Sequence, residues 1–474
     1  MKKFTILLFI SILFLSTVLA SEPVITMTTT DKIGSIISFV LKSETDNTNF
    51  QIDFGDGVLI DKTIGTNETT IEGPLVGSQT IKIYGENIIY LNCRQCQLTE
   101  LDVTNNIALT SLNCRDNQLS TLDLSNNKLL NDLYCSNNQL TNLDLNTNMA
   151  LTYLYFANNQ IKNLDVSTNS ALRELVCSDN QIGYLDVSTN TALTKLACDR
   201  NQLTMLDISK NLDLEYLFCY RNQLTNLDLS KNTSLKLVYC DNNKLSYLDV
   251  SKNMALTDLT CGNNQLTTLD VTNNTALTTL NCFSNQFNFN SLPLQNILYY
   301  AYSPQDSMLL DETINIGDTL DLSSQLSVNG NTTTYKWKTQ SNATLVLNTD
   351  YILFKGKTVF LKPQAEKVYC EMTNATFPSF IGINSFKTIS IKVSSPTLVN
   401  KTISQDIDLY TLKKNLYIDL PGNALISVYK INGKMILTTP VFKGKNIIEI
   451  PFSDIYLVRI KLNNVIITRK IIVQ

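Results

Sequence analysis

Apolar residues recur along the middle of the chain with a fixed period. The dipeptide Leu-Asp first appears at Leu101 and returns every 21 residues, nine times in all, up to Leu269. One complete unit, residues 109–130, follows the pattern LxxLxCxxNxLxxLDLSxNxxL. A period between 20 and 29 residues predicts a solenoid, in which each repeat forms one turn, here called a rung, and stacked rungs share a continuous core.

The positions within a rung predict its local structure. In LxC the apolar residues alternate, so one face of a short strand enters the core and the other faces water. The return segment LDVSxN is rich in Asp, Ser, Thr and Asn, which favours turns over helix. We therefore predict a mainly β solenoid of about ten rungs over residues 88–300, with little or no helix. An Asn whose inward amide can satisfy open backbone groups follows each strand: Asn117, Asn138, Asn159, Asn180, Asn201, Asn222, Asn243, Asn264 and Asn285.

Cysteine occupies one repeat position in nine rungs, and Phe156 fills it in the tenth. A chain of disulfides and a row of metal ligands are the alternatives to reduced, buried thiols. Stacked side chains point the same way and lack CxxC pairing, which favours buried thiols acting as small hydrophobes. Cys96 stands where the repeat expects Asn, so we predict a structural role for it in the first rung. The nine cysteines are Cys93, Cys114, Cys135, Cys177, Cys198, Cys219, Cys240, Cys261 and Cys282.

This repeat resembles the leucine-rich repeat family, in which LxxLxLxxN is the conserved segment, and especially bacterial surface proteins of the internalin-like kind. The resemblance extends from residue 88 to about residue 290. It implies that the outward positions of the LxC strand line a concave face that binds proteins.

The segments on either side of the repeat alternate as short strands. Residues 21–87 contain FQIDFGDG at 50–57, which resembles the GDG signature of PKD-like β-sandwiches and predicts a cap for the open end of the solenoid. Asp53 and Asp56 are expected to be turn residues, with a calcium site as the alternative. Residues 301–399 resemble an immunoglobulin-like sandwich, with Trp337 in its core and Cys370 unpaired.

The two ends of the chain resemble export signals. Residues 1–20 have the basic start, apolar run and small final residue of a signal peptide. Residues 400–474 resemble the C-terminal sorting domain of the type IX (Por) secretion system, with Gly433 in a turn and Asp454 where the family usually has Gly. The resemblance implies export through the type IX machinery, to the cell surface or beyond.

Composition excludes several functions. A net charge of −4 with 17% charged residues gives no excess of positive charge with which to bind nucleic acid. The chain has no His, which removes the common nucleophile triads and His-ligated zinc. We expect no enzyme activity, no metal site, no cofactor, no membrane-spanning segment and a monomer.

The outward columns of the predicted strands contain the candidate binding residues. Aromatic residues gather in the middle rungs, and acids flank them two rungs apart, too far for a glycosidase pair on an open sheet. We predict recognition of a protein or glycan, or adhesion, through this face; the alternative is a structural stalk or surface-layer component without a specific ligand. The outward Asp of each LDxS segment predicts turn hydrogen bonds, with a calcium-binding edge as the alternative. The candidate ligand-binding residues are Tyr134, Tyr153, Tyr155, Tyr216, Phe218, Tyr220, Tyr239, Asp132, Glu174, Asp199 and Asp241.

Overall fold

The regular secondary structure of the described residues is almost entirely β-strand. The structure of the protein, a computed structural model, describes residues 22–395, 409–412, 415–420, 422–451, 454–462 and 465–473, so the predicted signal peptide lies outside the described residues. The described helices are two 3-10 turns, η1 (Ser323–Gln325) and η2 (Gly382–Asn384), and none has the length and apolar character needed to span a bilayer. The chain forms two compact units, residues 1–238 and 239–474.

The first unit begins with strands that pair with both sides of the first rung. Strand β2 runs antiparallel to β7, and β1 runs antiparallel to β8, which follows β7 in the same rung. The GDG segment forms a turn, because Asp53 Oδ1 accepts the backbone N–H groups of Gly55 (2.7 Å) and Gly57 (2.9 Å). The strands are β1 (Ile25–Thr29), β2 (Ile36–Ser43), β3 (Thr48–Asp53), β4 (Ile60–Ile64), β5 (Thr69–Pro74), β6 (Thr80–Gly85), β7 (Ile88–Asn92) and β8 (Leu98–Asp102).

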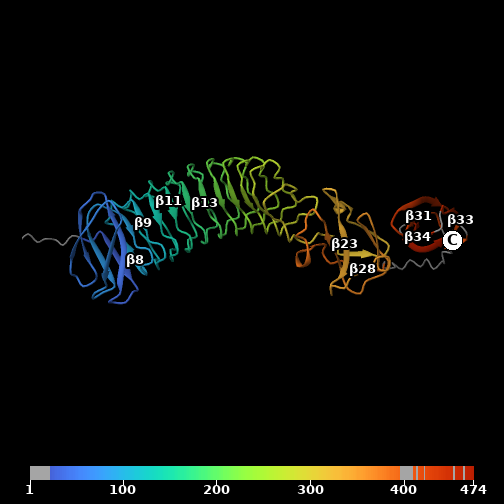
Figure 1. The fold of residues 1–474 in the computed structure, drawn as a ribbon, viewed down its shortest axis with the longest axis horizontal. Coiled ribbons are helices and arrows are strands. Elements are labelled where there is room, and N and C mark those ends of the chain that lie inside the picture. Colours follow the sequence, from blue (N-terminus) through green and yellow to red (C-terminus); the bar gives the residue numbers. More distant parts are fainter. Residues whose placement is uncertain are drawn as a thin grey trace, which may run out of the picture. The chain divides into compact units, whose positions relative to one another are not determined.

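The rungs then stack in parallel, as predicted. In Figure 1, β9, β11 and β13 follow one another along the solenoid. Leu133, Leu154 and Leu175 lie opposite one another in successive strands and are fully buried, while their neighbours on the strand face outward. The strands of this unit are β9 (Ser111–Asn113), β10 (Asp132–Tyr134), β11 (Tyr153–Tyr155), β12 (Glu174–Val176), β13 (Lys195–Ala197) and β14 (Tyr216–Phe218), and β15 (Leu237–Tyr239) spans the boundary between the units.

Cysteines and Phe156 form one buried column inside the repeat. All eleven cysteines of the chain are buried and free of disulfide bonds, and Phe156 is fully buried in the same column. Burial raises the pKa of the Cys114 thiol to about 12. Cys96, at the Asn position of the first rung, is also buried and donates its thiol to the backbone oxygen of Ser38.

The predicted asparagine ladder is confirmed. Asn180 Nδ2 donates to the backbone oxygens of Phe156, Cys177 and Ser178, each at 3.2 Å, and its Oδ1 accepts the N–H of Ile161 at 3.0 Å. Each amide thus joins its own rung to the preceding one.

A second asparagine ladder, which the sequence analysis did not assign, lies in the return segment. Asn190 is fully buried, and its Nδ2 donates to the backbone oxygens of Val166 (3.0 Å) and Asn169 (2.9 Å). Its Oδ1 is buried without a hydrogen-bond partner. Two columns of amides therefore line the interior. In the first column both the nitrogen and the oxygen of the amide form hydrogen bonds, whereas in the second only the nitrogen does.

The second unit continues the repeat to its end. Its strands β16 (Asp258–Thr260), β17 (Thr279–Asn281) and β18 (Tyr299–Ala301) are parallel, and β18 follows β17 without an LxC pattern. Gln305 replaces the ladder asparagine here: its Oε1 accepts the N–H of Asn285, and its Nε2 donates to the backbone oxygens of Cys282 and Tyr302. The ladder thus ends on a side chain that lies outside the 21-residue register.

Residues 302–395 form short sheets around a core that contains Trp337. This residue is fully buried, lies opposite Cys370, and donates its Nε1–H to Thr358 Oγ1 at 3.0 Å, as the prediction of a core tryptophan requires. An aromatic cluster that includes Phe289 and Phe377, with ring centroids 6.2 Å apart, joins this core to the last rung. The strands are β19 (Thr313–Asn315), β20 (Thr319–Asp321), β21 (Ser327–Val328), β22 (Asn331–Thr332), β23 (Thr334–Thr339), β24 (Tyr351–Phe354), β25 (Lys357–Phe360), β26 (Val368–Thr373), β27 (Phe386–Lys387) and β28 (Lys392–Ser394).

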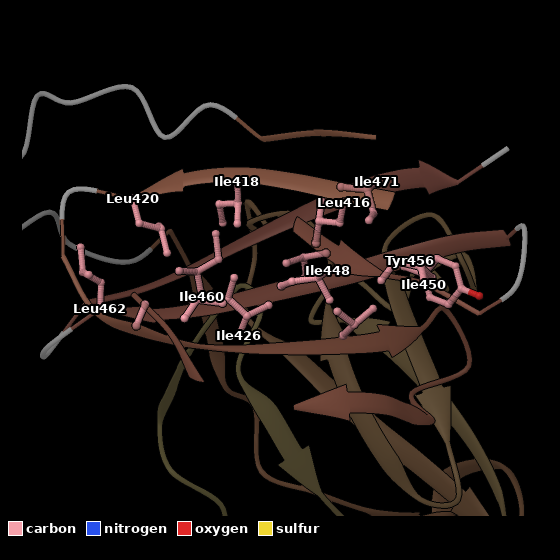
Figure 2. Packing of buried hydrophobic residues seen from close by; sticks show 14 residues of the cluster. Leu416, Ile418, Leu420, Ile426, Ile448, Ile450, Tyr456, Ile460, Leu462 and Ile471 are labelled. Carbon is pink, nitrogen blue, oxygen red and sulfur yellow. The ribbon is translucent and has the colours of Figure 1, made fainter. Parts of the chain in front are cut away.

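The C-terminal segment has its own apolar core between two sheets, β29-β30-β33 and β32-β31-β34-β35. Figure 2 shows Ile418, Ile426, Tyr456 and Ile460 among the side chains of this core. Asp454, where glycine was expected, forms an ion pair with Lys430 at 3.2 Å. The strands are β29 (Leu409–Leu412), β30 (Asn415–Leu420), β31 (Ala424–Lys430), β32 (Met435–Val441), β33 (Gly444–Glu449), β34 (Asp454–Leu462) and β35 (Val465–Val473).

Candidate functional site

The candidate site is the strand face. We define it as the outward-pointing residues of β7 and β9–β14, together with the residue that follows each member of the buried column of cysteines and Phe156. Parallel pairing aligns two columns on it. Asp132, Tyr153, Glu174, Lys195 and Tyr216 form one column, and Tyr134, Tyr155, Val176, Ala197 and Phe218 form the other. Tyr220 and Asp199 belong to the third column. Nine of the eleven predicted residues therefore share one face of the first unit.

Tyr155 is at the centre of a network of side chains whose polar and charged groups bind one another. Its hydroxyl donates to the carboxylate of Glu174, which also forms an ion pair with Lys195 at 3.3 Å. The rings of Tyr134 and Tyr155 lie 5.1 Å apart, and the guanidinium of Arg115 lies 4.3 Å from the Tyr134 centroid. Burial, followed by the hydrogen bond to Glu174, raises the pKa of Tyr155. These residues support one another across five rungs.

Asp199 is a correction to the sequence analysis, which expected its carboxylate to face solvent. The residue is only 4% exposed, because its Oδ1 accepts a hydrogen bond from Ser178 Oγ at 2.6 Å and the carboxylate also interacts with the Tyr220 hydroxyl. Burial raises the pKa of the Asp199 carboxyl, and the hydrogen bonds partly offset this effect. Asp199 and Tyr220 are therefore mutually engaged.

Three predicted residues on the strand face keep unused polar groups. One carboxylate oxygen of Asp132 is buried without a partner, and burial raises the pKa of this carboxyl. No described residue hydrogen bonds to the hydroxyl of half-buried Tyr153 or to that of Tyr216, which is 37% exposed. The two hydroxyls are open to a ligand, whereas the unpaired oxygen of Asp132 is closed off from solvent.

Arg115 and Lys195 were not among the predicted site residues. They hold the tyrosine network together, since Lys195 also lies 5.4 Å from the Tyr155 centroid. Both occupy outward columns beside tyrosines, so a search for cations next to aromatic positions could have found them.

Tyr239 and Asp241 lie in the second unit. Both are half-buried. Asp241 Oδ1 accepts a hydrogen bond from Thr260 Oγ1 at 2.9 Å, and burial raises the pKa of Tyr239.

The outward aspartates of the return segments form turns. Asp186 Oδ1 accepts the backbone N–H of Ser188 at 2.9 Å, and the same bond recurs from Asp102 to Asp270. Hydrogen bonds from the hydroxyl and the backbone N–H of Ser188 hold the pKa of Asp186 below its ordinary value. Among the described residues, no group of three or more Cys, Asp or Glu side chains is arranged to hold a metal ion.

Comparison with known proteins identifies the C-terminal segment. The family model described as "Secretion system C-terminal sorting domain" matches residues 412–474. No curated protein matches the chain. The segment is thus the type IX sorting domain that the sequence predicted, and it directs export to the cell surface or beyond.

Solved structures with similar repeats include three leucine-rich repeat proteins. The functional domain of InlJ from Listeria monocytogenes, described as including a cysteine ladder, is 22% identical and covers 68% of this chain and 94% of its own, with a TM-score of 0.34. YopM from Yersinia enterocolitica is 27% identical, with 44% and 45% covered and a TM-score of 0.37. The receptor kinase ectodomain GASSHO1/SCHENGEN3 from Arabidopsis thaliana is 26% identical, with 40% and 26% covered and a TM-score of 0.38. The leucine-rich repeat fold itself rests on this chain's 21-residue period and strand register.

Proposed function

We propose that this exported leucine-rich repeat protein recognises a partner at the cell surface through its strand face and performs no chemistry there. The observation that carries the proposal is the contrast between positions in one rung: the inward and return positions repeat, whereas the outward positions of the strands vary along the repeat and include several tyrosines. Tyrosine is a preferred residue of binding interfaces.

Two carboxylates of the strand face favour recognition over acid–base catalysis. Asp132 and Glu174 lie on alternate strands, about 9 to 10 Å apart at the backbone. Glu174 is engaged by Tyr155 and Lys195. Recognition requires only that the columns stay in register, which the parallel pairing provides.

The experiment compares the full exported chain with a variant that carries alanine at Tyr153, Tyr155, Phe218 and Tyr220. Both are tested for saturable binding to matrix proteins, host cells and polysaccharides. We expect binding that the variant loses while its circular dichroism remains unchanged. Equal binding by the two proteins would show that the partner binds a surface other than the strand face.

A structural stalk without a specific ligand is the second candidate. It is favoured by the mutual satisfaction of Tyr155 with Glu174 and of Tyr220 with Asp199, since such contacts also stabilise a sheet. A folded protein that binds no member of the panel would support this candidate.

A further inference from the structure

The open polar groups of the strand face lie in one column. Asp132 is directly opposite Tyr153, Glu174 and Lys195 follow, and Tyr216 lies beyond them. With rungs about 4.8 Å apart, Tyr153 and Tyr216 are separated by about 14 to 15 Å at the backbone. A ligand that reaches both tyrosines must therefore be an extended chain that crosses several rungs.

The charges within this column largely compensate one another. Glu174 is paired with Lys195, so the surface between the two tyrosines is neutral as a whole. Arg115 is in no ion pair among the described residues, and its guanidinium is packed over Tyr134. A strongly charged ligand would find no matching field here, whereas a neutral polar chain would bring no unpaired charge onto the sheet.

The unused groups include both donors and acceptors. The two tyrosine hydroxyls can each donate and accept a hydrogen bond. Each tyrosine also offers an aromatic ring. A sugar ring combines apolar C–H groups, which can pack on an aromatic ring, with hydroxyls that exchange hydrogen bonds with a phenol.

We propose that Tyr153 and Tyr216, three rungs apart, are the two ends of a binding site for an extended, neutral oligosaccharide. The inference rests on the proposed function and gives its ligand class. One sugar packs on the Tyr153 ring and bonds to its hydroxyl, and the chain crosses the Glu174–Lys195 pair to reach Tyr216. Neighbouring sugars advance along the column of rungs, so affinity depends on chain length.

The test measures binding of the full exported chain to uncharged oligosaccharides of increasing length by calorimetry. We expect long chains to bind and disaccharides to bind at least about tenfold more weakly. Tyr153→Ala and Tyr216→Ala should each weaken binding about tenfold or more, as loss of a central interface tyrosine does.

Two variants separate binding from folding. Tyr184→Ala removes a tyrosine that is 62% exposed outside the strands and should leave binding unchanged. Tyr153→Phe keeps the ring and should weaken binding less than Tyr153→Ala. A loss of binding in Tyr184→Ala equal to that in Tyr153→Ala would overturn the assignment.

The outcomes distinguish the ligand class from the function. One outcome is that the chain binds no neutral oligosaccharide but binds a protein, and that this binding is lost in Tyr153→Ala and Tyr216→Ala. In that case the glycan inference fails and the proposed function stands. If the folded chain binds neither glycans nor proteins, both fail. Equal affinity for short and long glycans would also overturn the two-ended site.

Discussion

The strand face and the return side belong to the same 21-residue repeat, yet residues recur on the return side and vary on the strand face. On the return side, an Asp turn and a buried Asn recur from rung to rung. On the strand face, successive rungs present Asp132, Tyr153 and Glu174 at one position. The repeated positions therefore specify the fold, and the strand face is free to carry a function. The following changes test that division, from the largest expected effect to the smallest.

Phe156→Ala should be the most destabilising change. Phe156 fills a fully buried column position that cysteine occupies in other rungs, so alanine leaves a cavity and costs about 3 to 5 kcal/mol of unfolding free energy. Cys177→Ala, at the next position of the column, removes one sulfur and should cost about 1 kcal/mol. Urea unfolding of both variants measures the difference. Similar losses would mean that the column does not pack as a continuous core.

The two asparagine ladders should differ in their contribution to stability. Asn180→Ala leaves several buried backbone groups unpaired and should cost about 2 to 3 kcal/mol. Asn190→Ala also removes an oxygen that has no partner, so its cost should be smaller, about 1 to 2 kcal/mol. Unfolding curves under identical conditions compare them. A larger loss for Asn190→Ala would show that its oxygen has a partner in solution.

The two kinds of aspartate should respond to acid in opposite directions. The folded pKa of Asp186 is lowered, so its stabilisation is present above the ordinary pKa and is lost as the pH falls through the folded value. The folded pKa of Asp199 is raised, so the folded state binds its proton first, and the unfolding free energy gains from this group as the pH falls through the folded value toward 3.8.

Unfolding measured from neutral pH down to about pH 3 tests this contrast. The stability difference between the wild type and Asp199→Asn should change as the pH falls toward 4, in the direction that favours the wild type. The difference between the wild type and Asp186→Asn should instead change only below about pH 4, where the wild type loses its advantage. A flat profile for Asp199→Asn would show that the carboxyl is solvated.

Tyr153→Ala and Tyr216→Ala should have the smallest effect on folding. Neither hydroxyl has a hydrogen-bond partner among the described residues, so the unfolding free energy should change by about 0.5 kcal/mol or less. Thermal melting of each variant beside Tyr155→Ala, whose hydroxyl bonds to Glu174, provides the comparison. Destabilisation equal to that of Tyr155→Ala would assign these tyrosines to the fold rather than to binding.

The repeat made the solenoid, the cysteine column and the first asparagine ladder predictable, because one period fixes which side chains stack. It could not show that Asp199 is buried, since its partners Ser178 and Tyr220 come from neighbouring rungs and no rule of the repeat pairs them. Gln305 escaped prediction for a related reason. It follows Asn285 by 20 residues instead of 21, and its longer side chain makes up the difference.

The cysteine column makes local unfolding of the solenoid measurable rung by rung. Nearly every rung carries one thiol, and burial protects each from thiol reagents. Burial also raises the pKa of thiols such as Cys114 and Cys282, which makes them less reactive. A rung that opens exposes its thiol to alkylation, and mass spectrometry of the labelled peptides would show which rung it was. The rates of labelling along the chain would therefore map where the solenoid frays and where it unfolds as one piece.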